Sequence, residues 1–268
     1  MAEMWYFNAG VNVSGGQYQQ SELRKNAFSS STQLGLHYLE RWGLNFRTAF
    51  LRFNFHDSNN NIQQNEVGFR LYKNIFSDWP KGTFTLLLGN YWVIGPDVDT
   101  TRVLYPEINY LNPTKSVSLG VGYANSIYSG ITNPSFTVNQ FTGTLGFSVF
   151  TKRFWFNLKN YLIQHDGLSY YTGQPSFVWY LPRSSRFIPS RLIVGGAIGK
   201  RVYAVEQETM LVYNTPDVQK GSIFSSVQWR LTDYFFFSLT MGAEYFNAQT
   251  NQKRYQYSFA NSSVSAFW

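Results

Sequence analysis

The chain has no cysteine, few charged residues and no long hydrophobic segment, and each absence excludes a class of protein. Without cysteine among its 268 residues, it can form neither disulfides nor thiolate metal sites. Charged residues make up only 14% of the sequence, whereas soluble proteins usually carry about a quarter. No apolar run approaches the roughly eighteen residues that a transmembrane helix needs. The composition therefore disfavours both an ordinary soluble protein and a helical membrane protein.

Aromatic residues, in contrast, are abundant, and apolar residues alternate with small polar ones. Phe, Trp and Tyr make up 19% of the chain. From Tyr234 to Phe246 every second residue is apolar, and the residues between include Ser238, Thr240 and Gly242. This period of two predicts a β-strand with one face in lipid and the other toward a wet interior. The mean hydropathy of −0.26 is compatible with a membrane location, because the two faces cancel in a window average.

The same alternation recurs along the whole chain, in about fourteen segments of roughly ten residues, with twelve or sixteen as alternatives. The sequence therefore predicts an all-β fold, a transmembrane antiparallel up-and-down β-barrel, in a single domain covering residues 1–268. An even number of strands places both termini on one side of the membrane. The long connections are expected on the opposite side, at Gly15 to Ser30, Gly95 to Pro106, His165 to Pro175 and Val205 to Gly221.

Two segments break the alternation, and each predicts a β-bulge, which inserts one extra residue and exchanges the two faces of a strand. In the third segment the apolar residues change parity between Phe46 and Phe53, which predicts a bulge near Phe50. In the last segment they change parity between Tyr257 and Val264, which predicts a bulge near Ala260.

Aromatic residues near the ends of the segments are expected to sit at the two membrane interfaces. Tryptophans gather on the side of the short turns, where they predict a girdle formed by Trp42, Trp79, Trp155 and Trp268. Tyrosines at other strand ends, Tyr128, Tyr203 and Tyr245, are likewise expected to be interface anchors.

The last two residues, Phe267 and Trp268, resemble the C-terminal aromatic signal by which bacterial outer-membrane proteins are recognised for assembly. This resemblance covers the whole chain. It implies a location in the bacterial outer membrane, periplasmic termini and the barrel-assembly machinery as a partner. The segment from Val117 to Tyr123 is similar to YaiO-type barrels, a family associated with envelope polysaccharide systems, which implies other envelope proteins as partners. Basic residues at the outer rim are expected to contact lipopolysaccharide phosphates. The first residues lack the regions of a signal peptide, as expected of a mature start, so export is inferred from the barrel pattern.

The interior of the barrel is predicted to be net basic. The residues projected inward are Arg47, Arg52, Arg70, Lys159, Arg201 and Arg230, opposed by Glu66, Glu107 and Glu244. Rings of arginine and lysine lower the barrier for negative solutes, which favours a narrow pore for small polar or anionic solutes. The alternative is a non-catalytic accessory barrel of an envelope complex, in which the same charges form internal ion pairs that close the lumen. Fourteen strands enclose an intermediate width, so the width alone leaves both functions open.

Catalysis and other binding functions have weaker support in the sequence. The run His56-Asp57-Ser58-Asn59 resembles the His-x-Ser-Asn signature of outer-membrane lipid hydrolases, but the expected register turns it inward, away from lipid. Asp97 and Asp99 supply fewer oxygen atoms than a calcium ion takes. The net charge of +7 is scattered along the chain instead of being gathered on one face, so no nucleic-acid partner is expected. The sequence predicts neither an enzyme nor a cofactor.

Overall fold

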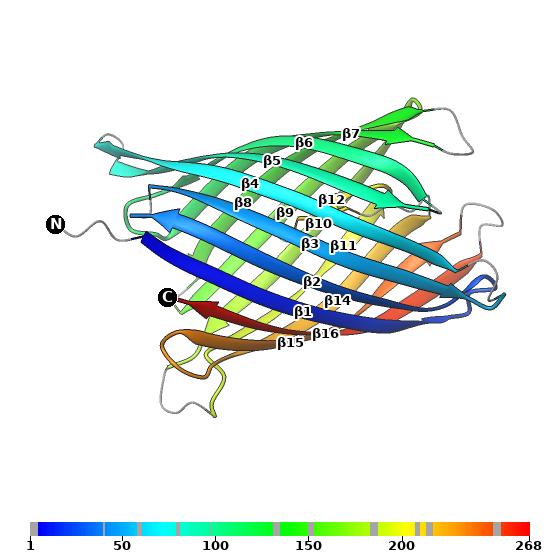
Figure 1. Cartoon of the computed structure of the whole chain (residues 1–268). Coiled ribbons are helices and arrows are strands. Elements are labelled where there is room, and N and C mark those ends of the chain that lie inside the picture. Colours follow the sequence, from blue (N-terminus) through cyan, green and yellow to red (C-terminus); the bar gives the residue numbers. More distant parts are fainter. Residues whose placement is uncertain are drawn as a thin grey trace.

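The computed structural model describes residues 5–39, 41–57, 61–78, 81–96, 98–130, 135–149, 153–182, 187–206, 210–212, 217–248 and 253–268. Fourteen strands form one closed antiparallel barrel, in which consecutive strands of the wall are neighbours and β1 pairs with β16 (Figure 1). This confirms the predicted fold class and strand number. The wall consists of β1 (Trp5–Gln19), β2 (Arg24–Tyr38), β3 (Trp42–Phe55), β4 (Ile62–Asp78), β5 (Lys81–Gly95), β6 (Val98–Leu111), β7 (Val117–Ser129), β8 (Phe136–Val149), β9 (Phe154–His165), β10 (Leu168–Tyr180), β11 (Arg191–Arg201), β14 (Val218–Arg230), β15 (Phe235–Asn247) and β16 (Arg254–Phe267).

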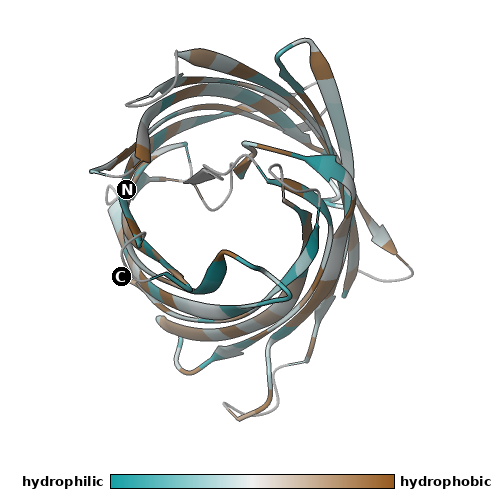
Figure 2. Ribbon diagram, turned by 90° about the vertical axis from the view of Figure 1, so that its right-hand side faces the viewer, coloured by the Kyte–Doolittle hydropathy of each residue, from teal (hydrophilic) through white to brown (hydrophobic). Residues whose placement is uncertain are grey.

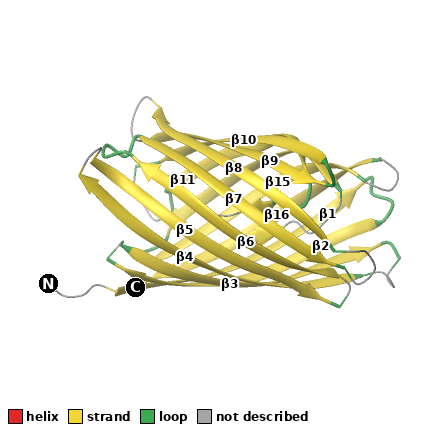
Figure 3. Cartoon of the chain, turned by 90° about the horizontal axis from the view of Figure 1, so that it is seen from above, coloured by secondary structure: helices red, strands yellow, loops and turns green. Residues whose placement is uncertain are grey.

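Two further strands stand apart from the wall. β12 (Val205–Glu206) and β13 (Leu211–Val212) pair with each other in the connection between β11 and β14. The described secondary structure consists of strands, as Figure 3 shows. Among the described residues, no helix is long and apolar enough to cross a membrane.

The two faces of the wall differ in chemistry because neighbouring strands keep apolar residues in register on the outside. Val11 of β1 pairs with Val264 of β16, and both side chains are exposed on the outer surface. The same holds around the barrel, where Leu34, Leu71, Leu119 and other large apolar side chains are exposed. Hydrophobic and hydrophilic residues alternate along the strands in Figure 2, where the strands form a closed ring. An apolar outer belt around a polar interior is the arrangement that suits a barrel in lipid.

Neither predicted bulge is present. The pairing of β3 with β4 runs without a shift from Trp42 opposite Lys73 to Phe53 opposite Ile62. The pairing of β16 with β1 is equally continuous through Ala260. The aromatic residues that suggested a change of face instead point inward, because lumen faces of this barrel carry rings as well as small polar groups.

The strands are longer than predicted, between 11 and 17 residues for those of the wall. Three of the four expected long connections are therefore mostly strand: β1 and β2 are separated by residues 20–23, and β9 and β10 by residues 166–167. Outward-facing residues near these ends are polar, among them Gln17, Arg52 and Asn139. The connection from residue 202 to 217 remains long.

The aromatic girdle differs in membership from the prediction. At the end of the barrel that holds the chain termini, Trp5 contacts Tyr38 and Trp42, each with ring centroids 5.0 Å apart. Trp268 stacks on Phe7, and Trp179 on Phe154. Trp155 instead faces the lumen, where its Nε1 donates a hydrogen bond to Asn157, and Trp79 lies outside the described residues.

We expect Gly68→Val to destabilise the barrel by about 1–3 kcal/mol, because a Cβ atom there would lie 2.4 Å from the buried ring of Tyr91. The matched control is Gly143→Val, since the space around Gly143 is open within 4 Å. Thermal unfolding in detergent, followed by heat-modifiable gel mobility, measures both. Equal unfolding temperatures for the two variants would contradict this prediction.

Candidate functional site

The connection between β11 and β14 folds into the barrel instead of extending away from it. We call its described residues, 202–206 and 210–212, the inner hairpin. The backbone N–H of Val205 donates to Gln140 Oε1 at 2.9 Å, and Gln140 Nε2 donates to the Val205 carbonyl oxygen at 2.8 Å. Gln140 points inward from β8, so these two bonds fix the inner hairpin against the interior wall.

Apolar contacts attach the inner hairpin to one side of the wall. Val205 and Met210 pack among the inward-facing residues Tyr91 and Tyr105, in a cluster that also contains Val93, Val103 and Ala124. Ala204 packs in a second cluster with Tyr128, Val138, Tyr161 and Ile163. The predicted membrane anchors Tyr128 and Tyr203 belong to this interior packing, with ring centroids 4.9 Å apart. Burying each of the larger side chains stabilises the attachment by about 1.5–3 kcal/mol.

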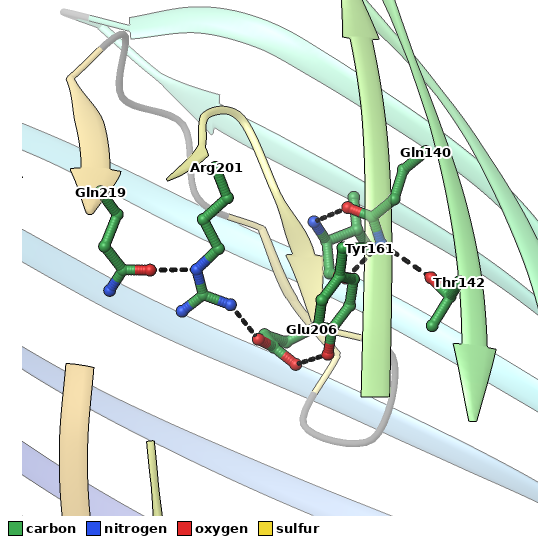
Figure 4. A network of polar contacts seen from close by, with 7 residues as sticks. Gln140, Thr142, Tyr161, Arg201, Glu206 and Gln219 are labelled. Carbon is green, nitrogen blue, oxygen red and sulfur yellow. Dashed lines mark hydrogen bonds and ion pairs between the residues drawn. The ribbon is translucent and has the colours of Figure 1, made fainter. Parts of the chain in front are cut away.

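Charged side chains hold the inner hairpin at two places, at its start beside β11 and at Met210. Arg201 forms an ion pair with Glu206 and donates a further hydrogen bond to Gln219 of β14, as Figure 4 shows. Glu206 also accepts a hydrogen bond of 3.0 Å from the hydroxyl of Tyr161. Just before β13, Arg47 Nη1 donates to the Met210 carbonyl oxygen at 2.9 Å while pairing with Glu66 at 2.8 Å. Wall residues from β3, β9 and β14 thus converge on this one segment.

The inner hairpin covers only part of the interior wall. The inward-facing residues beside it on β5 to β9 are almost completely buried; Val93, Tyr105 and Ile163, for example, are each 0% exposed. On the opposite side, the inward-facing residues of β14, β15, β16 and β1 are partly exposed along most of each strand. Solvent therefore reaches the interior along β14, β15, β16 and β1, and we call this surface the uncovered wall.

The predicted lumen residues fall into two groups. Eight residues project inward from the wall, namely Arg47, Arg70, Lys159, Arg201, Arg230, Glu66, Glu107 and Glu244. Arg52 does not. It is exposed on the outer face, opposite Phe28, and its Nε donates a hydrogen bond to Asn54. The prediction for Arg52 depended on the bulge near Phe50, so it is wrong for the same reason.

Several inward-facing charged residues were missed from the sequence. Arg24 lies at a shift of register in β2, pairs with Asp217 at 2.7 Å and donates to the Tyr255 hydroxyl at 2.7 Å. Glu206 and Asp217 belong to the connection that was expected to be an external loop. Arg191 begins β11 on the inward face, and the alternation of that strand was sufficient to place it.

Basic side chains face the whole length of the lumen, and those at its outer end, Arg24 and Arg201, are in ion pairs with Asp217 and Glu206. Arg191 and Arg230 lie at the end that holds the termini, on β11 and β14, and Arg70 and Lys159 lie farther in. The acidic groups Glu66, Glu206 and Asp217 are each paired with an arginine. The arrangement can favour negative solutes electrostatically, as rings of basic side chains do.

The other predicted chemistry has little structural support. His56 and Asp57 are exposed, and Ser58 and Asn59 lie outside the described residues, as does Asp97. Within the described ranges, no group of three or more His, Asp or Glu side chains could hold a metal ion.

Solved structures with the same fold are outer-membrane barrels. No protein-family model matches the sequence, and no curated protein matches it. A bacterial polysaccharide outer membrane secretin matches with a TM-score of 0.59 at 12% identity, over 98% of each chain. The toluene transporter TodX of Pseudomonas putida matches with a TM-score of 0.54 at 10% identity, over 98% of this chain and 88% of that one. The chain thus shares the fold of bacterial outer-membrane barrels.

We expect Glu206→Gln to loosen the inner hairpin, because it leaves Arg201 without its buried counter-charge. Since the chain has no cysteine, a single Ala204→Cys substitution supplies a specific probe at a position that is 1% exposed. Maleimide labelling of that cysteine should be about tenfold faster with Glu206→Gln, which corresponds to about 1.4 kcal/mol of local stability.

The control for this measurement is Arg230→Gln, which removes an exposed ion pair with Asp233 at the opposite end of the barrel. This variant should leave the labelling rate unchanged. Equal labelling rates in all three proteins would show that the pair of Arg201 and Glu206 does not hold the inner hairpin.

Proposed function

We propose that this protein is a non-catalytic channel of the bacterial outer membrane for small polar solutes, with a preference for anions. The observation that carries the proposal is the uncovered wall. Fourteen strands enclose more space than the eight of a barrel whose interior is filled by side chains. The inner hairpin fills one side of that space and leaves partly exposed polar residues along the other.

The anion preference is supported by the inward-facing basic residues. Arg70, Lys159, Arg191 and Arg230 face the middle of the lumen and its end at the termini, where they outnumber Glu107 and the Asp233 partner of Arg230, and three further acidic groups are neutralised by arginine partners. A positive potential in this part of the lumen raises the local concentration of negative ions.

The proposed location follows from the apolar outer belt and from the fold shared with outer-membrane barrels. With periplasmic termini, the tryptophan-rich end faces the periplasm, and Lys253 and Arg254 lie at the outer rim, near lipopolysaccharide phosphates. The barrel-assembly machinery would recognise Phe267 and Trp268, at the C-terminal end of the strand that closes the barrel.

A non-conducting accessory barrel of an envelope complex is the second candidate. It is favoured by the internal ion pairs, since Arg24 with Asp217, Arg47 with Glu66 and Arg201 with Glu206 are all in the interior. A correctly folded barrel that stays silent in planar bilayers would support this candidate against the channel.

Neutralising these basic residues of the lumen should reduce anion selectivity. With Arg70, Arg191 and Arg230 changed together to Gln, we expect the permeability ratio of anions to cations to fall about twofold or more. The measurement is the reversal potential of purified protein in a planar bilayer under a salt gradient. Arg52→Gln is the matched control, because Arg52 lies on the outer face. An unchanged reversal potential in the triple variant would refute the basic selectivity region.

Removing the inner hairpin should widen the channel. Replacing residues 204–212 with a short Gly-Ser linker uncovers the inner faces of β5 to β9, so single-channel conductance should rise about twofold or more. Deleting residues 249–252 from the connection between β15 and β16 is the control for shortening a loop. If conductance is the same in the two deletion variants, the inner hairpin does not narrow the pathway.

A further inference from the structure

Aromatic side chains line the uncovered wall in its half away from the termini. Tyr18 of β1, Tyr257 and Phe259 of β16 and Phe224 of β14 all point inward and are partly exposed. We call these four residues the aromatic track. The rings of Tyr18 and Tyr257 stack with centroids 4.6 Å apart, and those of Tyr257 and Phe259 with centroids 6.0 Å apart.

Glycines on neighbouring strands allow these rings to lie along the wall. A Cβ atom at Gly16 would be 2.6 Å from the ring of Tyr257, and one at Gly242 would be 2.7 Å from the ring of Phe259. Phe224 covers Gly195 in the same way, at 2.8 Å. The glycines thus provide the space in which each ring rests. Because these rings lie along the wall, they give the passage an aromatic surface and do not project across it.

Polar groups border the aromatic track on both sides along the barrel axis. Glu244 lies beside the track, directly opposite Tyr257 on β15, and toward the outer mouth lies the cluster of Arg24, Asp217 and Tyr255. Toward the termini, hydroxyl pairs continue along the same strands. Ser238 bonds Ser263 at 2.6 Å, and Thr240 donates to Ser226 at 2.8 Å. The uncovered wall thus combines a strip of aromatic rings with hydrogen-bonding groups above and below it.

We propose that the aromatic track binds a neutral linear oligosaccharide. This inference rests on the proposed channel function and adds a substrate class to it: the basic residues set the selectivity for small ions, whereas the aromatic track binds an uncharged sugar. A pyranose ring has an apolar face of C–H groups, which pack against the electron-rich face of an aromatic ring, and an equatorial rim of hydroxyls. Consecutive sugar units can therefore pack against the exposed ring surface of Phe259, Tyr257 and Tyr18 while their hydroxyls bond the polar groups of the same wall.

The alternative occupants of an aromatic wall fit this surface less well. A purely apolar solute would displace water from the polar side chains that border the track, such as Glu244 and Ser263, and would form no hydrogen bonds to them, which makes its binding costly. An acidic sugar would place its carboxylate near Glu244 at the level of Tyr257. A neutral sugar avoids both penalties, and a chain of several units is needed to span the whole aromatic track.

The test is blockage of the channel by sugars in a planar bilayer. Maltohexaose, cellohexaose and chitohexaose are added in turn to the wild-type protein, with glucose as the single-unit control. We expect at least one hexaose to interrupt the current at a concentration at least tenfold below that of glucose. In the double variant Tyr257→Leu with Phe259→Leu, the half-blocking concentration should rise about tenfold or more, and open-channel conductance should change less than twofold.

The matched control is Phe237→Leu, because Phe237 is on the outer face of β15 and stacks on Trp229. It should leave the half-blocking concentration unchanged. Heat-modifiable gel mobility verifies that each variant folds, and Tyr257→Leu alone replaces the double variant if that variant does not fold. An open channel that none of the three hexaoses blocks would overturn the aromatic track and leave the channel function intact.

A second readout separates the two proposals if no current is seen. Equilibrium dialysis of the detergent-solubilised barrel against radiolabelled hexaoses measures binding without conduction. Binding that is lost in Tyr257→Leu would support the aromatic track in a barrel that is not a channel. Absence of binding for all three hexaoses would overturn the track whatever the conductance.

Discussion

The backbone pairing of β1 with β16 is the interaction on which the rest of this structure depends. It runs from Asn8 opposite Phe267 to Gln19 opposite Gln256, and it leaves the sheet without an edge. In lipid an unpaired N–H or C=O group has no water to bond, so only a closed sheet can expose apolar side chains all around. Closure also fixes the face of every residue, since a slip of one residue would turn the whole apolar belt inward.

A wall of fourteen strands encloses more space than its own side chains fill, and the inner hairpin fills part of that space. The inner hairpin brings Ala204, Val205 and Met210 to the inner faces of β5 to β9, where tyrosine rings and small aliphatic side chains form the contact. The result is an asymmetric lumen with a packed side and a hydrated side. The ion pairs that looked like a closing network mostly hold this segment or the outer mouth, so internal pairing and a remaining passage coexist.

The sequence was sufficient to predict the barrel because lipid and water impose opposite requirements on alternate residues. Strands such as β7 and β15 therefore have an unambiguous register. The prediction failed where an inward-facing position carries an aromatic ring, as at Tyr257 and Phe259. The alternation alone assigns such a residue to the lipid face. Its inward position becomes clear only when the glycine beside it on the neighbouring strand is known. That neighbour is far away in sequence, as Gly16 is from Tyr257.

The inner hairpin was beyond sequence reasoning for a related reason. Val205 and Glu206 form a strand of two residues, too short to show a period, and their partners Gln140 and Tyr161 come from distant strands. The same holds for Arg24, whose inward position depends on a shift of register in β2. Residues placed by alternation within one strand could be predicted; residues placed by contacts across the lumen could not.

The length of the strands has a consequence for the level at which the inner hairpin is attached to the wall. A bilayer-spanning strand needs about 9–11 residues, whereas β1 has 15 and β4 has 17. The surplus is at the end away from the termini, where Gln17 and Asn139 replace the apolar belt on the outside. The barrel therefore continues beyond the hydrocarbon as a free-standing collar. Gln140, which carries the inner hairpin, is adjacent to Asn139 at that height, so this attachment of the hairpin lies in the collar, above the lipid.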